Sequence, residues 1–219
     1  MTPPRDRPHL GNLRGVEAPT PIDAESPEAS TLLTAAEALE AGGVIAIPTD
    51  TVYGLAADIA RPDAIERIFD IKARPRQKSL ILFVEDLSQA RGWVEESAAL
   101  RILAERFWPG PLTLVLPGTA HVPAELRAAD GSVALRVPAH AVPRRLVAAL
   151  GRPLVTTSAN LSGAPSLTEA PDVFEALGAQ LAMVLDAGSS PGGEASTVLS
   201  LLEEPARVLR PGPISEEAI

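Results

Sequence analysis

Four cationic side chains within seven residues are the chemically most informative feature of this sequence. Both lysines of the chain, Lys72 and Lys78, lie in the segment 72–78, and Arg74 and Arg76 lie between them. No acidic residue interrupts the segment, so the four charges repel one another unless an anion binds between them. Lysine supplies a compact point charge, and arginine a planar fork that matches two phosphate oxygens. The segment is therefore a candidate polyphosphate site, and the alternative interpretation is a solvated basic loop.

A second polar cluster follows a strand predicted at residues 154–156. The run from Thr156 to Ser166 contains five hydroxyl side chains and the amide of Asn160. Small side chains and Gly163 allow main-chain N–H groups to point into one concavity, which can hold phosphate oxygens without a lysine-containing loop. A capped turn is the alternative interpretation.

Two arginines and one turn add further candidates. Alternation along a predicted strand places Ser132 and Arg136 on the same face. An arginine among apolar strand residues requires an anion, either the carboxylate of a ligand or a structural Asp or Glu. Arg210, at the end of another predicted strand, raises the same question. Residues 48–55 place two hydroxyls, including that of Thr51, a carboxylate and a phenol after a buried strand, unless these groups only bond their own turn.

Composition excludes several classes of chemistry. Cysteine is absent, which rules out disulfides, thiolate zinc sites, iron–sulfur clusters and a cysteine nucleophile. The sequence contains neither G-x-x-x-x-G-K-[ST] nor G-x-G-x-x-G, so phosphate binding needs another device. The net charge of −9 argues against a broad electrostatic surface for nucleic acid, although a local basic patch is compatible with it.

The elements that must position these residues alternate between helix and strand. Residues 1–28 are rich in proline and poor in apolar side chains, so we expect a flexible tail there and one domain over residues 29–219. Apolar periodicity predicts helices at residues 31–40, 63–72, 97–107, 141–150 and 171–178, and strands at 44–47, 80–84, 112–116, 133–137, 154–156, 183–185, 197–201 and 207–209. This order predicts an α/β fold with a mixed sheet flanked by helices. The absence of a long apolar run and of a signal-like N-terminus predicts a cytoplasmic protein.

Seven motifs, in order, resemble the YrdC family of L-threonylcarbamoyladenylate synthases. They are residues 48–55, Lys72-x-Arg74-Pro75, residues 107–113, residues 135–138, Thr157-Ser158-Ala159-Asn160-x-Ser162-Gly163, Ser196-Thr197-Val198 and Arg210-Pro211-Gly212. The resemblance covers residues 30–214 and is closest to the short form of the family, without an additional C-terminal domain. It implies a twisted α/β domain around a positively lined central cavity. It also implies the conversion of L-threonine, bicarbonate and ATP to threonylcarbamoyl-AMP and pyrophosphate.

The resemblance assigns roles to the residues at matching positions. The tetrad around the phosphates would be Lys72, Arg74, Ser158 and Asn160. Contacts to ATP would come from Arg74, Lys78, Ser132, Ser158, Ser166 and Arg210. Contacts to threonine would come from Thr51, Arg136, Thr156 and Ser196. Mg²⁺ would be carried by ATP, with no metal site built by the protein.

Two departures from the family pattern and two alternatives accompany this interpretation. Phe83 stands where members commonly have a histidine, and Ser79 where proline is usual. The implied product would be passed to the machinery that adds threonylcarbamoyl to tRNA beside the anticodon.

One alternative is a non-catalytic member that binds tRNA or double-stranded RNA, against which the 3% content of aromatic residues argues. The other is a paralogue with different adenylate chemistry.

Overall fold

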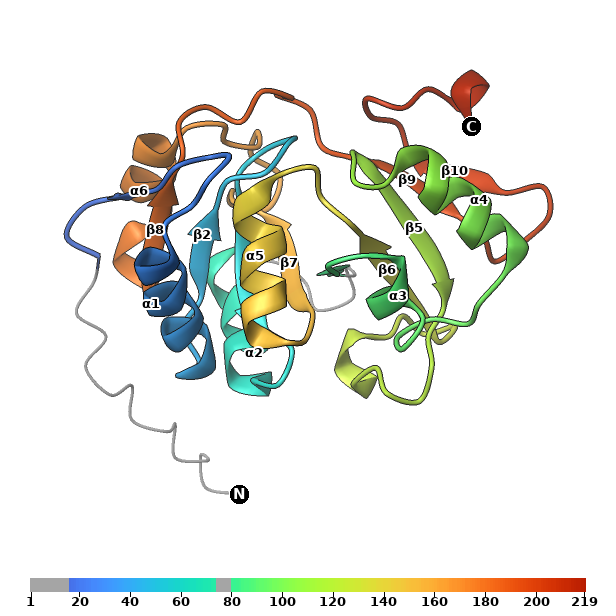
Figure 1. The fold of residues 1–219 in the computed structure, drawn as a ribbon, viewed down its shortest axis with the longest axis horizontal. Helices are drawn as coiled ribbons and strands as arrows, with labels where there is room; N and C mark the ends of the chain where they lie inside the picture. Colours follow the sequence, from blue (N-terminus) through green and yellow to red (C-terminus); the bar gives the residue numbers. More distant parts are fainter. Residues whose placement is uncertain (1–15, 74–79) are drawn as a thin grey trace, which may run out of the picture.

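Ten strands form one twisted mixed sheet in the computed structural model, which describes residues 16–73 and 80–219 (Figure 1). The strands are β1 (Thr20–Pro21), β2 (Ile45–Ile47), β3 (Gly54–Asp58), β4 (Ile81–Phe83), β5 (Leu112–Pro117), β6 (Ser132–Arg136), β7 (Leu154–Ser158), β8 (Met183–Asp186), β9 (Thr197–Ser200) and β10 (Arg207–Arg210). Their order across the sheet is β1-β8-β2-β3-β7-β4-β6-β5-β9-β10. The pairs β1/β8, β2/β8, β4/β6 and β5/β9 are parallel, and the other neighbours are antiparallel.

Helices flank this sheet, which confirms the predicted α/β class. In the described residues they are α1 (Ala29–Glu40), α2 (Pro62–Ile71), α3 (Leu87–Ala90), α4 (Ala98–Phe107), α5 (Ala141–Leu150) and α6 (Ala170–Leu177), with short 3-10 turns at Ala124–Leu126, Gly178–Gln180 and Glu216–Ala218. None of the helices in these residues has the length and apolar character that a membrane crossing requires.

Helices α1 and α5 lie side by side on one face of the sheet (Figure 1). Leu39 of α1 and Leu146 of α5 are fully buried in a core that includes Ile45 and Ile47 of β2. Burial of one such side chain contributes about 1.5–3 kcal/mol. This apolar layer therefore covers the β8-β2-β3 part of the sheet.

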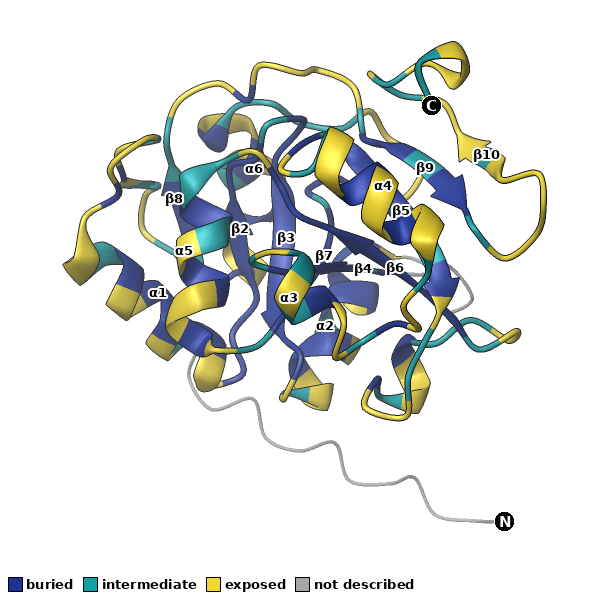
Figure 2. Cartoon of the chain, turned by 45° about the vertical axis from the view of Figure 1, so that its right-hand side comes forward, coloured by how far each residue is buried: buried dark blue, intermediate teal, exposed yellow. Residues whose placement is uncertain are grey.

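The opposite face carries a larger core under α2, α4 and α6. Ile68 of α2, Leu100 of α4 and Val173 of α6 are fully buried there, together with Leu82 of β4 and Leu114 of β5. Figure 2 shows the same arrangement, with buried strands between helices whose outer faces are exposed. On this side a continuous apolar layer supports the sheet from β2 to β9.

The sequence predicts a flexible tail over residues 1–28, and the structure contradicts this for residues 20–22. Thr20 and Pro21 pair with Leu185 and Asp186 of β8 in parallel register, and Ile22 is buried in the core under α1. The domain therefore includes residues 20–22. Local composition concealed this because the pairing partner lies more than 160 residues away in the sequence. Residues 1–15, the other part of that expectation, lie outside the described residues.

Strand β3 was not predicted from the sequence, which indicates only a cluster of polar groups over residues 48–55, with a self-bonded turn as the alternative. All five residues of β3 are buried, so the strand lacks the apolar and polar alternation that marks a half-exposed strand. Gly54 and two alanines within it also have low strand propensity. The strand forms because β2 and β7 pair with it on both sides.

A buried ion pair at the end of β3 yields a stability prediction. Asp58 is fully buried, and both its oxygens accept hydrogen bonds from Arg152, at 2.7 and 2.6 Å. Replacing Arg152 with alanine leaves this carboxylate without its cation, so we expect a loss of about 3–5 kcal/mol in the free energy of unfolding. Urea denaturation measures it. As a control, Arg91→Ala removes an exposed pair with Glu96 and should cost less than about 1 kcal/mol. Equal losses in the two variants would contradict this account.

Candidate functional site

A cavity of about 400 Å³ lies over one face of strands β4, β5, β6, β7, β9 and β10. On β5 the alternate residues Thr113 and Val115 line it. The residue between them, Leu114, points to the core on the other face. The predicted site residues on the lining are Thr51, Ser132, Arg136, Thr156, Ser158, Ser196 and Arg210. The structure thus brings together seven residues that are up to 159 positions apart in sequence.

Arg136 is the most deeply held cation of this cavity. Its guanidinium is 3% exposed and donates from Nε to the carbonyl oxygen of Gly110 (2.9 Å), from Nη1 to Oγ1 of Thr51 (3.0 Å), and from Nη2 to Oδ1 of Asp50 (2.6 Å). The structural carboxylate that the sequence left open is therefore Asp50. A guanidinium has five N–H groups, and the other two have no acceptor among the described residues.

The loop of Gly110 and the aromatic ring of Phe83 complete the surroundings of Arg136. The Gly110 amide donates to the carbonyl of Val137 (2.9 Å), and a Cβ at this position would lie 2.3 Å from the carbonyl oxygen of Phe107. Only glycine therefore brings this carbonyl to Arg136. Phe83 lies opposite Arg136 in the β4/β6 register, with its ring centre 5.7 Å from the guanidinium carbon, which is within cation–π range.

Arg210 is the second cation on the lining, and it is tied to Ser196. Its Nε and Nη2 donate to the carbonyl oxygen of Ser196 at 3.1 and 2.7 Å, and Nη2 also donates to the Ser196 hydroxyl at 3.2 Å. That hydroxyl lies 2.8 Å from the hydroxyl of Thr113. The two strand ends, β9 and β10, therefore present one connected set of donors to the cavity.

The cavity's electrostatics favour an anionic ligand. Burial lowers the pKa of Arg136, which the neighbouring Asp50 partly opposes and the charge of Arg210 reinforces. Burial likewise lowers the pKa of Arg210. Both guanidinium groups stay charged near neutral pH, because the ordinary arginine pKa lies above 12. Arg136 is buried, whereas Arg210 is exposed at the end of β10. Their like charges repel each other, and an anion bound between them would relieve this repulsion.

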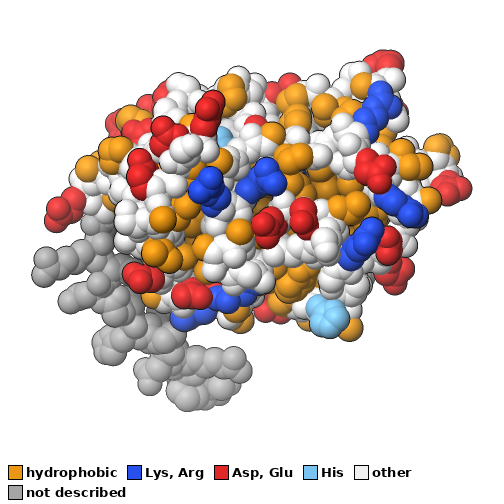
Figure 3. Space-filling model, in the orientation of Figure 1, with side chains coloured by type: hydrophobic (Ala, Val, Ile, Leu, Met, Phe, Trp, Pro, Cys, Tyr) orange, Lys and Arg blue, Asp and Glu red, His pale blue; other side chains and the backbone are white. Residues whose placement is uncertain are grey.

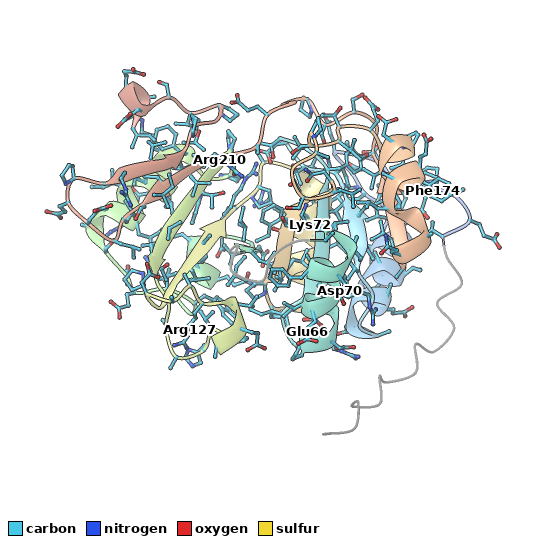
Figure 4. All side chains as sticks on the ribbon, turned by 180° about the vertical axis from the view of Figure 1, so that it is seen from behind. Glu66, Asp70, Lys72, Arg127, Phe174 and Arg210 are labelled. Atoms are coloured by element: carbon cyan, nitrogen blue, oxygen red, sulfur yellow. The ribbon has the colours of Figure 1, made fainter. Side chains whose placement is uncertain are left out.

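Lys72 and Asn160 meet beside the cavity, behind Ser158. The Lys72 ammonium donates to the carbonyl oxygens of Ser158 (2.5 Å) and Asn160 (2.7 Å) and to Oδ1 of Asn160 (3.0 Å). Ser158 Oγ donates to the same Oδ1 at 2.6 Å, and the Asn160 amide donates to the Ala164 carbonyl at 2.6 Å. Figure 4 shows Lys72 at the end of α2 and Arg210 on the outermost strand. Lys72 thus joins the end of α2 to the loop after β7.

The other predicted site residues differ in whether they are described, whether they line the cavity and which groups they contact. Arg74 and Lys78 lie outside the described residues. Ser166 is half-buried in the loop before α6 and does not line the cavity. Thr156 lines it, but its hydroxyl donates to the carbonyl of Ile81 at 3.0 Å. Ser132 is buried on the lining, and its amide donates to Oδ1 of Asp130.

Three contributors to the site were missed by sequence reasoning, namely Gly110, Thr113 and Asp130. Gly110 and Thr113 belong to the motif 107–113, so the motif itself was the signal for them. Asp130 lines the cavity, and its pKa is lowered by hydrogen bonds from Ser132. For Asp130, the available signal was its position two residues before Ser132. Among the described residues, histidine and acidic side chains form no group of three or more that could hold a metal ion.

Gly212 closes the C-terminal segment against β9 and supports a second stability prediction. A Cβ on this residue would lie 2.5 Å from both the Ala195 carbonyl oxygen and the Thr197 amide nitrogen. We expect Gly212→Ala to displace this backbone and to cost about 1–3 kcal/mol of unfolding free energy. Thermal or urea denaturation measures the loss. Gly92→Ala is the control, because its Cβ would meet nothing closer than 3.5 Å; a Gly212 variant as stable as that control would refute the close packing.

Comparisons with known proteins agree with this geometry. A sequence profile of the Sua5, YciO and YrdC proteins, described as "Telomere recombination", matches residues 37–212. The threonylcarbamoyl-AMP synthase of Pyrococcus abyssi is 40% identical over 84% of this chain and 55% of its own length. A putative threonylcarbamoyl-AMP synthase of Mycobacterium tuberculosis is 36% identical over 90% of this chain and 92% of its own.

Solved structures show the same fold. The P. abyssi Sua5 structure with L-threonine superposes with a TM-score of 0.86 at 38% identity, covering 90% of this chain and 59% of that one. Escherichia coli YciO gives 0.82 at 29% identity, covering 88% and 94%. The chain spans about half the length of the first two curated relatives that it matches. The profile match alone covers most of the sequence, and the chain belongs to the Sua5/YciO/YrdC family.

Proposed function

We propose that this protein is a threonylcarbamoyl-AMP synthase, which converts L-threonine, bicarbonate and ATP to threonylcarbamoyl-AMP and pyrophosphate. The observation that carries the proposal is the buried Arg136, which lines a 400 Å³ cavity together with several hydroxyl groups and has two N–H groups with no acceptor among the described residues. The names of the relatives, and the L-threonine in the P. abyssi Sua5 complex, supply the substrate class.

The amino-acid end of the cavity would lie at Arg136. The threonine carboxylate would take the two N–H groups left on the guanidinium, in the charge-assisted geometry that arginine favours. Thr51, Thr156 and Ser196 present hydroxyl oxygens around the same space. Their hydrogen bonds to the protein fix where these oxygens lie, which would orient the substrate's own amine and hydroxyl.

The phosphate end would lie toward Ser158. Ser158 lines the cavity and is bonded to the Lys72–Asn160 cluster. Arg210 and Ser132 would contact ATP from the other strands. Arg74, Lys78 and Ser166 remain predictions as ATP contacts. Mg²⁺ would enter on the ATP phosphates and neutralise part of their charge.

The reaction then needs positioning and charge stabilisation rather than a protein nucleophile. The threonine amine combines with bicarbonate to give a carbamate and water. A carbamate oxygen forms a bond to the α-phosphorus of ATP, and the bond from that phosphorus to the bridging oxygen breaks, releasing pyrophosphate. Cationic groups beside the phosphates stabilise the charge that develops on them. The phenol of Tyr53 is not suited to acid–base work, because burial raises its pKa to about 12.

Downstream, threonylcarbamoyl-AMP would be consumed by the cytoplasmic machinery that transfers its acyl group to tRNA. On the face shown in Figure 3, acidic and basic side chains are interspersed, so that face offers no broad basic surface for RNA. The likeness to YciO over nearly its whole length keeps a paralogue with different adenylate chemistry as the second candidate.

The deciding experiment incubates the protein with ATP, Mg²⁺ and bicarbonate, and with each amino acid in turn. We expect pyrophosphate release and a threonylcarbamoyl-AMP mass only with L-threonine. Pyrophosphate release with another amino acid, together with the mass of that amino acid's own carbamoyl adenylate, would identify the paralogue. Release of no pyrophosphate with any amino acid, combined with salt-sensitive RNA binding, would overturn the proposal in favour of a binding protein.

A further inference from the structure

We propose that Asp50 is a positioning residue of the amino-acid site, which holds the Arg136 guanidinium in the orientation that receives the substrate's carboxylate. This inference rests on the proposed function. Asp50 does not line the cavity, so it acts through Arg136 rather than by touching the substrate.

The contact between the two residues is short and enclosed. Asp50 Oδ1 accepts from Arg136 Nη2 at 2.6 Å, and the side chains are 12% and 3% exposed. Charge-assisted hydrogen bonds of this length are among the strongest in proteins. Because few water molecules can reach the pair, Asp50 is the dominant partner that fixes this end of the guanidinium plane.

The backbone that carries Asp50 is itself held in place. Thr49 Oγ1 accepts from the amides of Thr51 and Val52 at 3.0 and 3.2 Å and donates to the Val52 carbonyl at 2.6 Å. The Thr51 carbonyl accepts from the Gly193 amide at 3.0 Å. Two consecutive side chains of this turn, those of Asp50 and Thr51, therefore reach one guanidinium from a fixed backbone.

Stability alone does not explain the Asp50 carboxylate. Its second oxygen, Oδ2, is buried and has no hydrogen-bond partner among the described residues. Burying a carboxylate with one oxygen unsatisfied is costly, and buried ion pairs are weak contributors to stability even when well paired. The effect of the Asp50 carboxylate on Arg136 explains why the protein carries this energetic cost. The carboxylate keeps the guanidinium charged and leaves two of its N–H groups for a ligand.

The pair at Asp58 and Arg152 provides a matched comparison. It has the same shortest distance, 2.6 Å, and a buried carboxylate, but none of its members lines the cavity. Both Asp58 oxygens are bonded to the arginine. A variant that removes the charge of Asp58 therefore shows the general effect of losing a buried carboxylate, because Asp58 does not contact Arg136.

The experiment measures L-threonine and ATP binding by calorimetry, and both Michaelis constants, for wild type, Asp50→Asn, Asp50→Ala and Asp58→Asn. We expect the Kd and the Michaelis constant for threonine to rise at least tenfold in both Asp50 variants, with the ATP constants and kcat changed less than threefold. The Asp58 variant should keep both ligand affinities within twofold. Unfolding midpoints are recorded for each protein, and the isosteric Asp50→Asn remains informative if Asp50→Ala does not fold.

Four results would overturn the inference. Wild-type threonine affinity in a folded Asp50→Asn variant removes the positioning role while leaving the proposed function intact. Equal losses for threonine and ATP in Asp50→Asn show a general structural role, as does the same threonine loss in Asp58→Asn. A wild-type protein that binds no threonine overturns the proposed function together with the inference.

Discussion

Replacing Arg136 with lysine is expected to raise the Michaelis constant for L-threonine at least about 100-fold, because two hydrogen bonds to a charged group at about 1.5–3 kcal/mol each are lost or misaligned. Lysine keeps the positive charge opposite Asp50, so the buried carboxylate is not left without a cation. It cannot bond Gly110, Thr51 and Asp50 at once while presenting further N–H groups to a ligand. The effect should therefore fall on threonine far more than on ATP.

Steady-state kinetics of pyrophosphate release, with threonine and ATP varied in turn, measures this selectivity. Arg152→Lys is the control, because it makes the same exchange in an ion pair that does not line the cavity. Its Michaelis constants should stay within twofold of wild type. An Arg136→Lys protein that is folded and has a wild-type Michaelis constant for threonine would remove Arg136 from the amino-acid site.

Local pattern was sufficient to predict the elements that carry the site. The amphipathic spacing of residues 63–72 predicted α2 within one residue of its bounds, Pro62–Ile71. Alternation placed Ser132 and Arg136 on one strand face, and both line the cavity. Such features depend on neighbours within a few residues, which a single sequence displays directly.

Contacts between distant segments could not be predicted in the same way. Asp50 and Arg136 are 86 residues apart, and nothing in either local sequence selects Asp50 over other acids of the chain. The pairing of β1 with β8 and the burial of both faces of β3 likewise depend on elements far away in sequence. The resemblance to a family supplied the grouping of the site residues that local periodicity could not.

The structure also changes the expectation for Lys72. The sequence predicts a side chain that follows charge on the phosphates, whereas its ammonium already bonds three oxygens of residues 158 and 160. Lys72 is 2% exposed. A structural role, tying the loop after β7 to α2, is therefore established by the contacts, and a role toward ATP is a separate hypothesis that needs its own measurement.

Lys72→Met is expected to lower kcat for threonine-dependent pyrophosphate release by roughly 100- to 1,000-fold, the usual effect of removing a group that stabilises charge in a transition state. Methionine fills the volume of the lysine stem without its charge. The carbonyls of Ser158 and Asn160 lose their donor, so the unfolding free energy should fall by about 1–3 kcal/mol. Single-turnover pyrophosphate release and urea denaturation measure the two effects separately.

Asn160→Ala distinguishes the two roles of Lys72, because it removes one oxygen of the tie at Oδ1 and keeps the ammonium. If Lys72 acts only by holding the loop after β7, loosening that loop is the sole cause of the loss in both variants. The kcat values of Lys72→Met and Asn160→Ala should then fall by similar factors. If its charge acts on the phosphates, Lys72→Met should be slower than Asn160→Ala by tenfold or more at saturating ATP. A folded Lys72→Met protein with wild-type turnover would exclude both roles in the reaction and leave only the structural tie.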